Sequence, residues 1–435
     1  MLWAKDDAMN PTSPHGDAAT SHTDATSAPE PTGPLKGLRV LDLSRILAGP
    51  ACTQWLGDLG CDVVKVERPG RGDDTRHWGP NYVHDTNGDP TLESAYYLSA
   101  NRNKRSLAVD IAKPAGAALI RELVPHFDIV VENFKVGGLA RYGLDYASLR
   151  PLHPGLIYCS ITGFGQSGPY AHRAGYDYLA QGMGGFMSLT GAPDGEPIKA
   201  GVAVADIMCG MFACNAIVAA LYHRERSGEG QYLDLSLLDS QVGMLFYEGL
   251  NYLSTGEIPV RRGNGHPNIV PYQVFEASDG YFILAVGNDD QFKRFCVFAG
   301  LVELADDPRF ATNNARVKNR TELTHLIAAQ TTKKTAAQWI AGLEEIDVPS
   351  APVNTMDRVF ADPQVLHREM RITMAQTSAG NVPVDLIGNP MKFSKTPVNY
   401  RQSPPGLGEH TDSVLGEFLD LDPQALQALK DDGVI

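Results

Sequence analysis

Residues 37–69, GLRVLDLSRILAGPACTQWLGDLGCDVVKVERP, decide the fold class. Residues 37–44 predict a short apolar strand, residues 48–60 a helix with Pro50 in its first turn, and residues 62–69 a second strand. A strand, a helix and a second strand within about thirty residues are typical of the start of a doubly wound parallel sheet. We therefore expect an α/β protein with a Rossmann-like large domain.

The rest of the chain extends this sheet and then changes character. Apolar runs predict strands at residues 106–110, 128–132, 156–161 and 231–237, and helices at residues 114–124, 206–223 and 238–254. After a polar stretch at residues 256–271, a hairpin turning at Asp279-Gly280 and two amphipathic helices at 321–330 and 335–345 predict a smaller α+β domain. The expected division is a disordered extension (1–34), the large domain (35–225), a linker helix (226–255), the small domain (256–348), and a return to the large domain with a C-terminal helix at 423–431 (349–435).

The composition is that of a globular protein with an acidic balance. Of 435 residues, 43% are hydrophobic, and 51 Asp and Glu against 37 Lys and Arg give a net charge of −14. An acidic chain disfavours nucleic acid and anionic membranes as main partners. No apolar run approaches about 18 residues, so we expect no membrane span. Six scattered cysteines without a CxxC pair indicate buried thiols in a reducing, cytoplasmic compartment, and the chain offers no metal-ligand cluster.

One carboxylate, Asp177, stands out in the segment GYDYLAQGMGG (residues 175–185). It follows the glycine-rich stretch SITGFGQSGPY and precedes an apolar stripe of Leu179, Met183, Phe186 and Met187 at helical spacing. An aspartate at a helix start near exposed N–H groups can be held ionised and act as a nucleophile. The alternative is that Asp177 only caps the helix.

Other motifs are weaker. GFGQSG (residues 163–168) fits GxGxxG, but Pro169 follows at once and no helix opens on the last glycine, so NAD binding is disfavoured and a loop over an active site fits better. Basic residues cluster early, at Arg45, Lys65, Arg68, Arg71, Arg76, Arg102, Lys104, Arg105, Lys135 and Arg141. Several follow strands, where phosphates or carboxylates bind open sheets, although each alone is typical of a solvated surface. Gly263-Asn264-Gly265-His266-Pro267 is either a linker turn or a glycine flap carrying a histidine.

Together these blocks resemble the class III CoA-transferases (CaiB/BaiF family), which include formyl-CoA transferase and carnitine CoA-transferases. The resemblance runs from about Pro34 to the C-terminus and rests on residues 34–76, NRNKRSLAVD, VVENFKVGGLARYGLD, SITGFGQSGP with GYDYLAQ, GNGHPNIVPYQVF with DGYFILAVGND, and LGEHTDSVL. GDDTRHWGP, NRNKRS, RAGYD and NIVPYQVF are similar to the succinyl-CoA:glutarate, or dicarboxylate, branch.

The resemblance implies an interlaced homodimer with a large domain built from both chain ends. It implies that Asp177 is the catalytic residue and that CoA and acyl-CoA are substrates, with no permanently bound cofactor. The family's CoA contacts fall on Ile46, Leu47, Ala48, Arg68, Asn133, Phe134, Lys135, Gly138 and Arg141. Leu47 stands where formyl- and oxalyl-transferring members have Gln, which disfavours formate and oxalate. Arg45, Arg76, Arg102 and His266 are expected to hold a second substrate carboxylate, and the loop with Gly263, Gly265 and His266 is expected to act as a lid.

Three rival functions remain open from the sequence alone. The same fold serves 2-methylacyl-CoA racemases, which move a proton between two bases. A second rival is a CoA-binding protein without catalysis, and a third is an NAD-dependent oxidoreductase.

Overall fold

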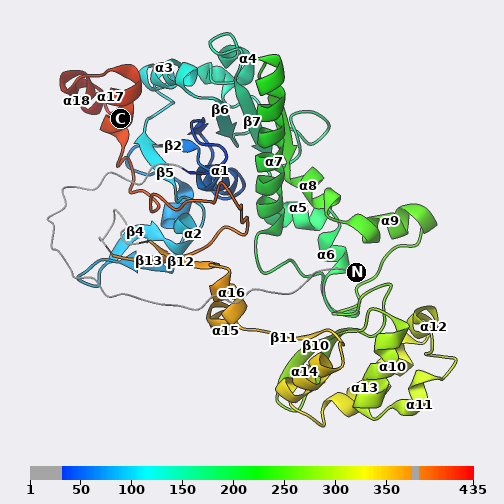
Figure 1. Ribbon diagram of the computed structural model, residues 1–435. Coiled ribbons are helices and arrows are strands. Elements are labelled where there is room, and N and C mark those ends of the chain that lie inside the picture. Colours follow the sequence, from blue (N-terminus) through cyan, green and yellow to red (C-terminus); the bar gives the residue numbers. More distant parts are fainter. Residues whose placement is uncertain (1–31, 375–381) are drawn as a thin grey trace.

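The computed structural model describes residues 32–374 and 382–435, and its centre is a six-stranded parallel sheet (Figure 1). The strand order is β5-β2-β1-β6-β7-β8. These strands are β1 Arg39–Asp42, β2 Asp62–Glu67, β5 Lys104–Ala108, β6 Ile129–Glu132, β7 Ile157–Thr162 and β8 Tyr232–Ser236. The order reverses between β1 and β6, and open sheets bind ligands at such a switch point, beyond the carboxyl ends of the strands. The predicted α/β class with a large parallel sheet is confirmed.

Helices cover both faces of the sheet because successive strand residues point to opposite sides. Val40 belongs to the core shared with the helices of one face, and its neighbour Leu41 belongs to the core of the other face. The first face carries α1 (Ala48–Asp58) and α7 (Val204–Ser227), and the second carries α3 (Pro114–Leu123), α17 (Thr411–Leu419) and α18 (Pro423–Asp431). The Asp110 N–H donates to the Val434 carbonyl, so the end of the chain lies against β5 and its following loop.

Helix α7 corrects the expectation that no apolar segment is long enough to cross a membrane. By length and composition alone, this 24-residue helix is apolar enough to cross a membrane. In the structure it packs against α1, β7 and β8, and Cys209, Ala213 and Ile217 are fully buried in that contact. A core helix of a soluble fold passes the same length and composition test, which is therefore weak evidence for a membrane span.

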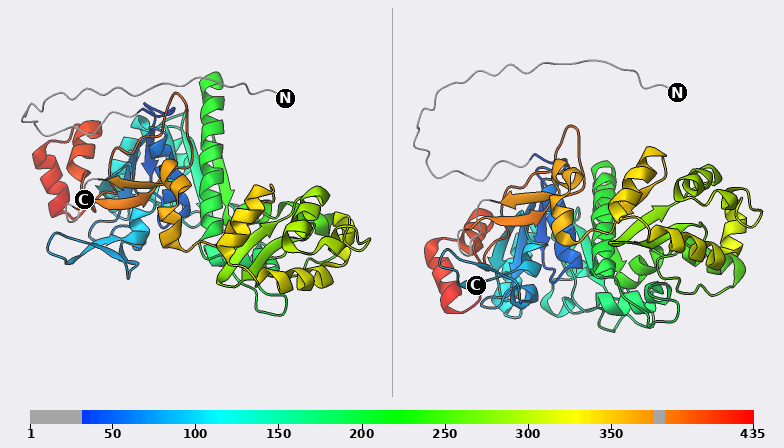
Figure 2. Two further views of the ribbon diagram at one scale, coloured as in Figure 1. Left: turned by 60° about the horizontal axis from the view of Figure 1, so that its bottom comes forward. Right: turned by 90° about the horizontal axis from the view of Figure 1, so that it is seen from below.

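A second lobe lies beside the sheet (Figure 2). Its antiparallel sheet has β10 (Gly280–Ala285) between β9 (Tyr272–Ala277) and β11 (Ser350–Pro352). Its helices are α10 Asp289–Ala299, α11 Val302–Ala305, α12 Asn313–Lys318, α13 Arg320–Thr331 and α14 Ala336–Glu345. Its core is aromatic, with Phe282 stacked on Trp339. The predicted hairpin is present, with Ala277 opposite Gly280, so the turn is Ser278-Asp279.

The remaining elements connect these parts or flank the large sheet. Two antiparallel pairs are β3 (Tyr82–His84) with β4 (Pro90–Ser94) and β12 (Arg371–Met374) with β13 (Val384–Ile387). The short helices are α2 Ala95–Leu98, α4 Tyr146–Leu149, α5 Asp177–Met183, α6 Phe186–Leu189, α8 Leu237–Gly243, α9 Phe246–Thr255, α15 Met356–Ala361 and α16 Pro363–His367. Single 3₁₀ turns are η1 Asp74–His77, η2 Val124–His126 and η3 Ala140–Tyr142.

Two predicted helices are interrupted. The helix expected at residues 238–254 is two helices, α8 and α9, and the break ends at Phe246, whose φ is 39°. The apolar stripe that begins at Leu179 is divided between α5 and α6 by Gly184 and by Gly185, which takes a φ of 86°. Leu179 and Met183 are exposed rather than packed in this chain's core. The domain boundaries stay a prediction, and most of the expected extension at residues 1–34 lies outside the described residues.

Candidate active site

Asp177 is positioned by two helices. It is the first residue of α5, but the side chain faces the start of α7. Its Oδ1 accepts hydrogen bonds from the backbone N–H groups of Ala205 (2.8 Å) and Asp206 (3.2 Å), and its Oδ2 accepts one from Gln181 Nε2 (2.6 Å). The carboxylate thus satisfies N–H groups at the positive end of a long helix. Asp177 does cap a helix, although it is α7 rather than the helix it begins.

Two glycines bring the segment of Asp177 against the glycine-rich loop. A Cβ built on Gly163 would lie 2.3 Å from the Gly175 Cα, and a Cβ on Gly175 would lie 2.1 Å from the Gly163 Cα. No other residue fits such a backbone contact. The loop is fastened further along, where the Gln166 N–H donates to the Asp234 carboxylate. The glycines of this motif therefore serve close backbone packing next to Asp177.

Asp206 is a second carboxyl group at the same place, which the sequence analysis missed. Burial, followed by the charge of the nearby Asp177, raises its pKa to about 7. No hydrogen bond or ion pair to the Asp206 side chain is present in the described part of the chain. Tyr96 is the neighbour of both carboxyl groups. Burial, followed by the charges of Asp206 and Asp177, raises the pKa of its hydroxyl to about 12. Position 206 gave a sequence signal only as an acidic residue in the first turn of an apolar helix.

Two cavities lie at the carboxyl ends of β1, β2, β6 and β7. The smaller has a volume of about 190 Å³ and is lined by both aspartates, and the larger has a volume of about 790 Å³. Arg45 and residues 134–136 line both, so the two cavities adjoin. This is the sheet position where the strand order reverses, as expected for a ligand site of this fold class.

The nine residues that the resemblance assigned to CoA are divided between these cavities. Those in the larger cavity are Arg68, Phe134, Lys135, Gly138 and Arg141. Those in the smaller cavity are Ile46, Leu47, Ala48, Asn133, Phe134 and Lys135. Residues from separate parts of the sequence therefore meet around one continuous space.

Not all of the residues expected to bind the second substrate carboxylate line the two adjoining cavities. Arg76 is 2% exposed, and its guanidinium forms an ion pair with Glu67 (2.7 Å) and also contacts the Tyr97 hydroxyl. Arg102 is equally buried and pairs with Asp58 (2.6 Å). Neither arginine lines either of the two cavities, so we do not retain them as substrate anchors. The sequence could not show this burial, because no local sequence pattern pairs Arg76 with Glu67 or Arg102 with Asp58.

Arg45 and the expected lid have different surroundings. Arg45 lines both cavities and pairs with Asp74 at 3.0 Å. The Gly263 N–H donates to the Gly191 carbonyl, and Gly265 adjoins Arg320. The His266 ring lies between Tyr247 and Tyr272, and burial followed by the charge of Arg320 lowers its pKa. In this chain the loop does not line either cavity.

Arg173 is a cation that the sequence analysis did not select. It lines the smaller cavity, and its guanidinium lies 4.8 Å from the centre of the Tyr170 ring and 5.3 Å from that of Phe164. No carboxylate partner of Arg173 is present among the residues that the structure describes. Arg45, Lys135 and Arg173 together make this small space favourable for anions.

A parallel α/β sheet with a carboxylate beside a basic cavity at its switch point is typical of an α/β protein that binds an anionic ligand there. Comparison with known proteins identifies which one. A model of CoA-transferase family III matches residues 35–411. The chain belongs to this family and is a class III CoA-transferase, which confirms the resemblance.

Individual proteins agree with the family assignment. A succinate–glutarate CoA-transferase of Agrobacterium fabrum is 51% identical over 393 residues, covering 90% of this chain and 98% of that protein. A succinyl-CoA:glutarate CoA-transferase of Homo sapiens is 42% identical, covering 92% of this chain and 90% of that protein. The crystal structure of a CaiB/BaiF family protein from Brucella suis is similar with a TM-score of 0.79 and 49% identity, covering 89% of this chain and 100% of that chain.

Proposed function

We propose that this enzyme transfers CoA from succinyl-CoA to glutarate or a closely related dicarboxylic acid, with Asp177 as the nucleophile. The observation that carries the proposal is the Asp177 carboxylate at the start of α7, in a cavity that adjoins a larger basic one. Similarity to two succinate–glutarate enzymes supports the choice of acids. CoA thioesters are substrates here, and the proposed chemistry requires no other bound group.

The proposed reaction exchanges one activated acyl group for another. Asp177 attacks the thioester carbonyl of the donor, forming an aspartyl-acyl anhydride and CoA thiolate. The thiolate then attacks the aspartyl carbonyl, which releases the donor acid and leaves an aspartyl-CoA thioester. The acceptor carboxylate attacks this thioester, and the returning thiolate takes the acyl group from the second anhydride and regenerates Asp177. Water must be excluded while either anhydride exists.

The larger cavity suits the nucleotide part of CoA. Arg68, Arg71, Lys135 and Arg141 line it and match the negative phosphates. The smaller cavity then receives the thioester, since it contains Asp177 and connects with the larger one through Arg45 and residues 134–136.

A dicarboxylate leaves one carboxylate free while the other reacts. Of the anchors expected from the sequence, Arg45 stays in the proposal, and Arg173 replaces Arg76 and Arg102 because it lines the reactive cavity without a carboxylate partner in the described chain. Leu47 stands at the wall of the same space. The loop at residues 263–266 remains a proposed lid, which would have to move or come from another subunit.

A homodimer is part of the proposal. The helices next to Asp177 expose an unusual number of large apolar side chains for a monomer. They are Leu179, Met183, Met211, Phe212, Tyr222, Phe246, Leu250 and Leu253, on α5, α7 and α9. A second copy of the chain would cover this face, as the family resemblance implies. We place the enzyme in the cytoplasm, in keeping with six cysteines that are buried as free thiols.

The test is a CoA-exchange assay read by mass spectrometry. Wild type, Asp177→Ala and Asp177→Asn receive succinyl-CoA with a pool of mono- and dicarboxylic acids. We expect a new dicarboxyl-CoA with wild type only. D177N is the matched control, because its amide oxygen still accepts from the N–H groups of α7, so its loss of transfer reflects the lost nucleophile. Transfer by a folded D177A enzyme would refute the assignment, and α-deuteration of a 2-methylacyl-CoA in deuterated water without an acceptor acid would favour the racemase.

A further inference from the structure

The turn between β1 and α1 is held in an unfavourable backbone conformation. Ile46 has a φ of 72°, in the left-handed region. A β-branched residue is a genuine outlier there, because its Cβ is crowded by the backbone. Such conformations persist only where the surrounding structure imposes them, and they concentrate at functional sites. This turn borders the smaller cavity through Arg45, Ile46, Leu47 and Ala48.

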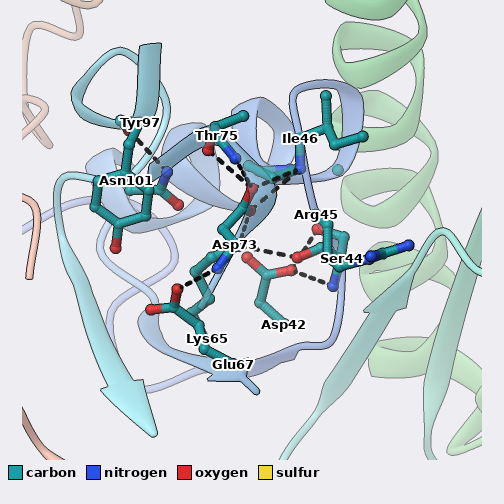
Figure 3. Close-up of polar contacts among 12 residues, drawn as sticks. Asp42, Ser44, Arg45, Ile46, Lys65, Glu67, Asp73, Thr75, Tyr97 and Asn101 are labelled. Atoms are coloured by element: carbon teal, nitrogen blue, oxygen red, sulfur yellow. Dashed lines mark hydrogen bonds and ion pairs between the residues drawn. The ribbon is translucent and has the colours of Figure 1, made fainter. Parts of the chain in front are cut away.

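Side chains hold five successive polar groups of this turn's backbone, and Figure 3 shows the bonds to Ser44 and Ile46. Asp42 accepts from the Ser44 N–H at 2.9 Å, and Lys65 Nζ donates to the Ser44 carbonyl at 2.9 Å. Asn133 accepts from the Arg45 N–H and donates to the Arg45 carbonyl. Asp73 accepts from the Ile46 N–H, at 3.1 Å to the nearer oxygen. Irregular backbone is rarely bound this completely by side chains from four different places in the chain.

The residues that hold the turn are themselves fixed by buried charges. Lys65 Nζ and Asp73 Oδ2 form an ion pair of 2.9 Å in which both side chains are fully buried. Asp73 also accepts from the N–H and the hydroxyl of Thr75. Asp42 is paired with Lys104 at 3.1 Å. Despite burial, which acts in the opposite direction, these neighbours lower the pKa of Asp73 and Asp42 and raise that of Lys65, so all three stay charged.

A contribution to stability alone does not explain this arrangement. Buried ion pairs are weak sources of stability, because desolvation offsets the attraction. Here Asp42, Lys65 and Asp73 each also bond the backbone of one strained turn, which is a wall of the proposed substrate cavity. Buried, fully bonded charge is well suited to imposing one geometry on such a wall.

We propose that the Lys65–Asp73 pair is a positioning device that keeps Ile46 in its strained conformation and so shapes the CoA-binding wall formed by Arg45, Ile46, Leu47 and Ala48. Neither residue of the pair lines the smaller cavity that contains Asp177, but both line the larger one. An action through the turn differs from a direct action on CoA in that it depends on the residue at position 46. The inference rests on the proposed function, since it assumes that CoA occupies the two adjoining cavities.

The test is a double-mutant cycle in which glycine removes the strain. Glycine adopts a φ of 72° without cost, so I46G needs no device to hold it there. CoA affinity is measured by calorimetry for wild type, D73N, I46G and I46G/D73N. We expect D73N to weaken CoA binding about tenfold in the wild-type background. In the I46G background the same change should have little effect. An equal loss in both backgrounds, or no loss in either, would overturn the inference.

A matched control separates positioning from general destabilisation. Asp58 forms another fully buried ion pair, with Arg102, at the far end of α1 from the turn. D58N should lower the melting temperature and leave CoA affinity unchanged. A D58N enzyme with the same loss of CoA affinity as D73N would count against the proposal, since any broken buried pair would then have that effect.

Two further outcomes keep the test decisive. If D73N does not fold, a comparison of the melting temperatures of I46G and I46A replaces the double-mutant cycle. Both variants remove the Ile side chain, but only glycine relieves the strain. I46G should therefore melt at a higher temperature than I46A. An I46G variant that melts no higher than I46A would overturn the strain argument. Absence of CoA binding to folded wild type would overturn the proposed function together with this inference, whereas normal wild-type binding with an indifferent D73N would overturn the inference only.

Discussion

The smaller cavity is bordered by the beginnings of two helices, and these two helix ends have different partners. At α7, the N–H groups of Ala205 and Asp206 are bound by the protein's own carboxylate, Asp177. At α1, the residue before the helix is Leu47, which makes no side-chain capping bond, and the first turn contains no acidic residue. Both ends carry the positive potential of a helix start. In the proposed reaction, one end holds the nucleophile, and the other is left for the negative charge that develops on the substrate.

The largest effect is expected from displacing the nucleophile at the α7 end. Gly163→Ala would place a methyl group 2.3 Å from the Gly175 Cα and push the segment of Asp177 away from its position. Since small misplacements of catalytic groups are costly, kcat should fall about a hundredfold while CoA affinity changes little. Steady-state transfer kinetics and CoA titration measure the two quantities.

Gly201→Ala is the control for this substitution. Nothing lies within 4 Å of a Cβ at Gly201, and its φ is not in the left-handed region. It should therefore transfer CoA at the wild-type rate. A G163A enzyme with full kcat would show that the close glycine contact does not set the position of Asp177.

An intermediate effect is expected from making the α1 end resemble the α7 end. Leu47→Asp places a carboxylate at the cap position of α1, where it would accept from the Gly49 N–H, since Pro50 at the next position has none, and add about 1 kcal/mol of stability at most. The same carboxylate would occupy the positive end that we assign to the substrate and would repel its charge. We expect kcat to fall about tenfold or more without a loss of melting temperature.

Leu47→Asn separates the charge from the loss of the leucine. Asn caps helices about as well as Asp but brings no charge, so L47N should lose less activity than L47D. Equal losses in both variants would mean that the apolar wall at Leu47 matters and the charge does not.

The contrast between the helix ends marks what the sequence could and could not predict. Residues 37–69 contain local signals for each element, and β1, α1 and β2 form there as expected. Asp177 could be proposed from the sequence because glycines and a helix start surround it. Asp206 was missed because its pKa depends on burial and on Asp177, which is 29 residues away in the sequence. Arg76 and Arg102 were misassigned because their ion pairs with Glu67 and Asp58 bury them away from the cavities. The strain at Ile46 leaves no trace in the sequence, since isoleucine there suggests ordinary strand or helix.

The smallest effect is expected from Asp206→Asn, and it is a change in pH dependence. With a native pKa of about 7 against 3.8 for an ordinary aspartate, the folded protein keeps this proton while the unfolded chain loses it. The contribution of Asp206 to stability is therefore complete below pH 3.8 and is lost as the pH rises to 7. D206N has no carboxyl group to titrate at this position. The melting temperature of D206N, measured relative to that of wild type, should therefore rise between about pH 4 and pH 8.

The same proton should affect substrate binding at the α7 end. Below pH 7, Asp206 is neutral; above it, Asp206 presents a negative charge to the anionic acceptor acid. The KM for glutarate should therefore rise several-fold from about pH 6 to pH 8 in wild type and stay flat in D206N, while Tyr96, with a pKa of about 12, stays neutral throughout. Asp290→Asn, an exposed aspartate in the first turn of α10, is the control and should keep the wild-type profile. A flat wild-type KM would mean that Asp206 is charged across this range or too far from the acceptor to repel it, and the division of roles between the two aspartates would have to be abandoned.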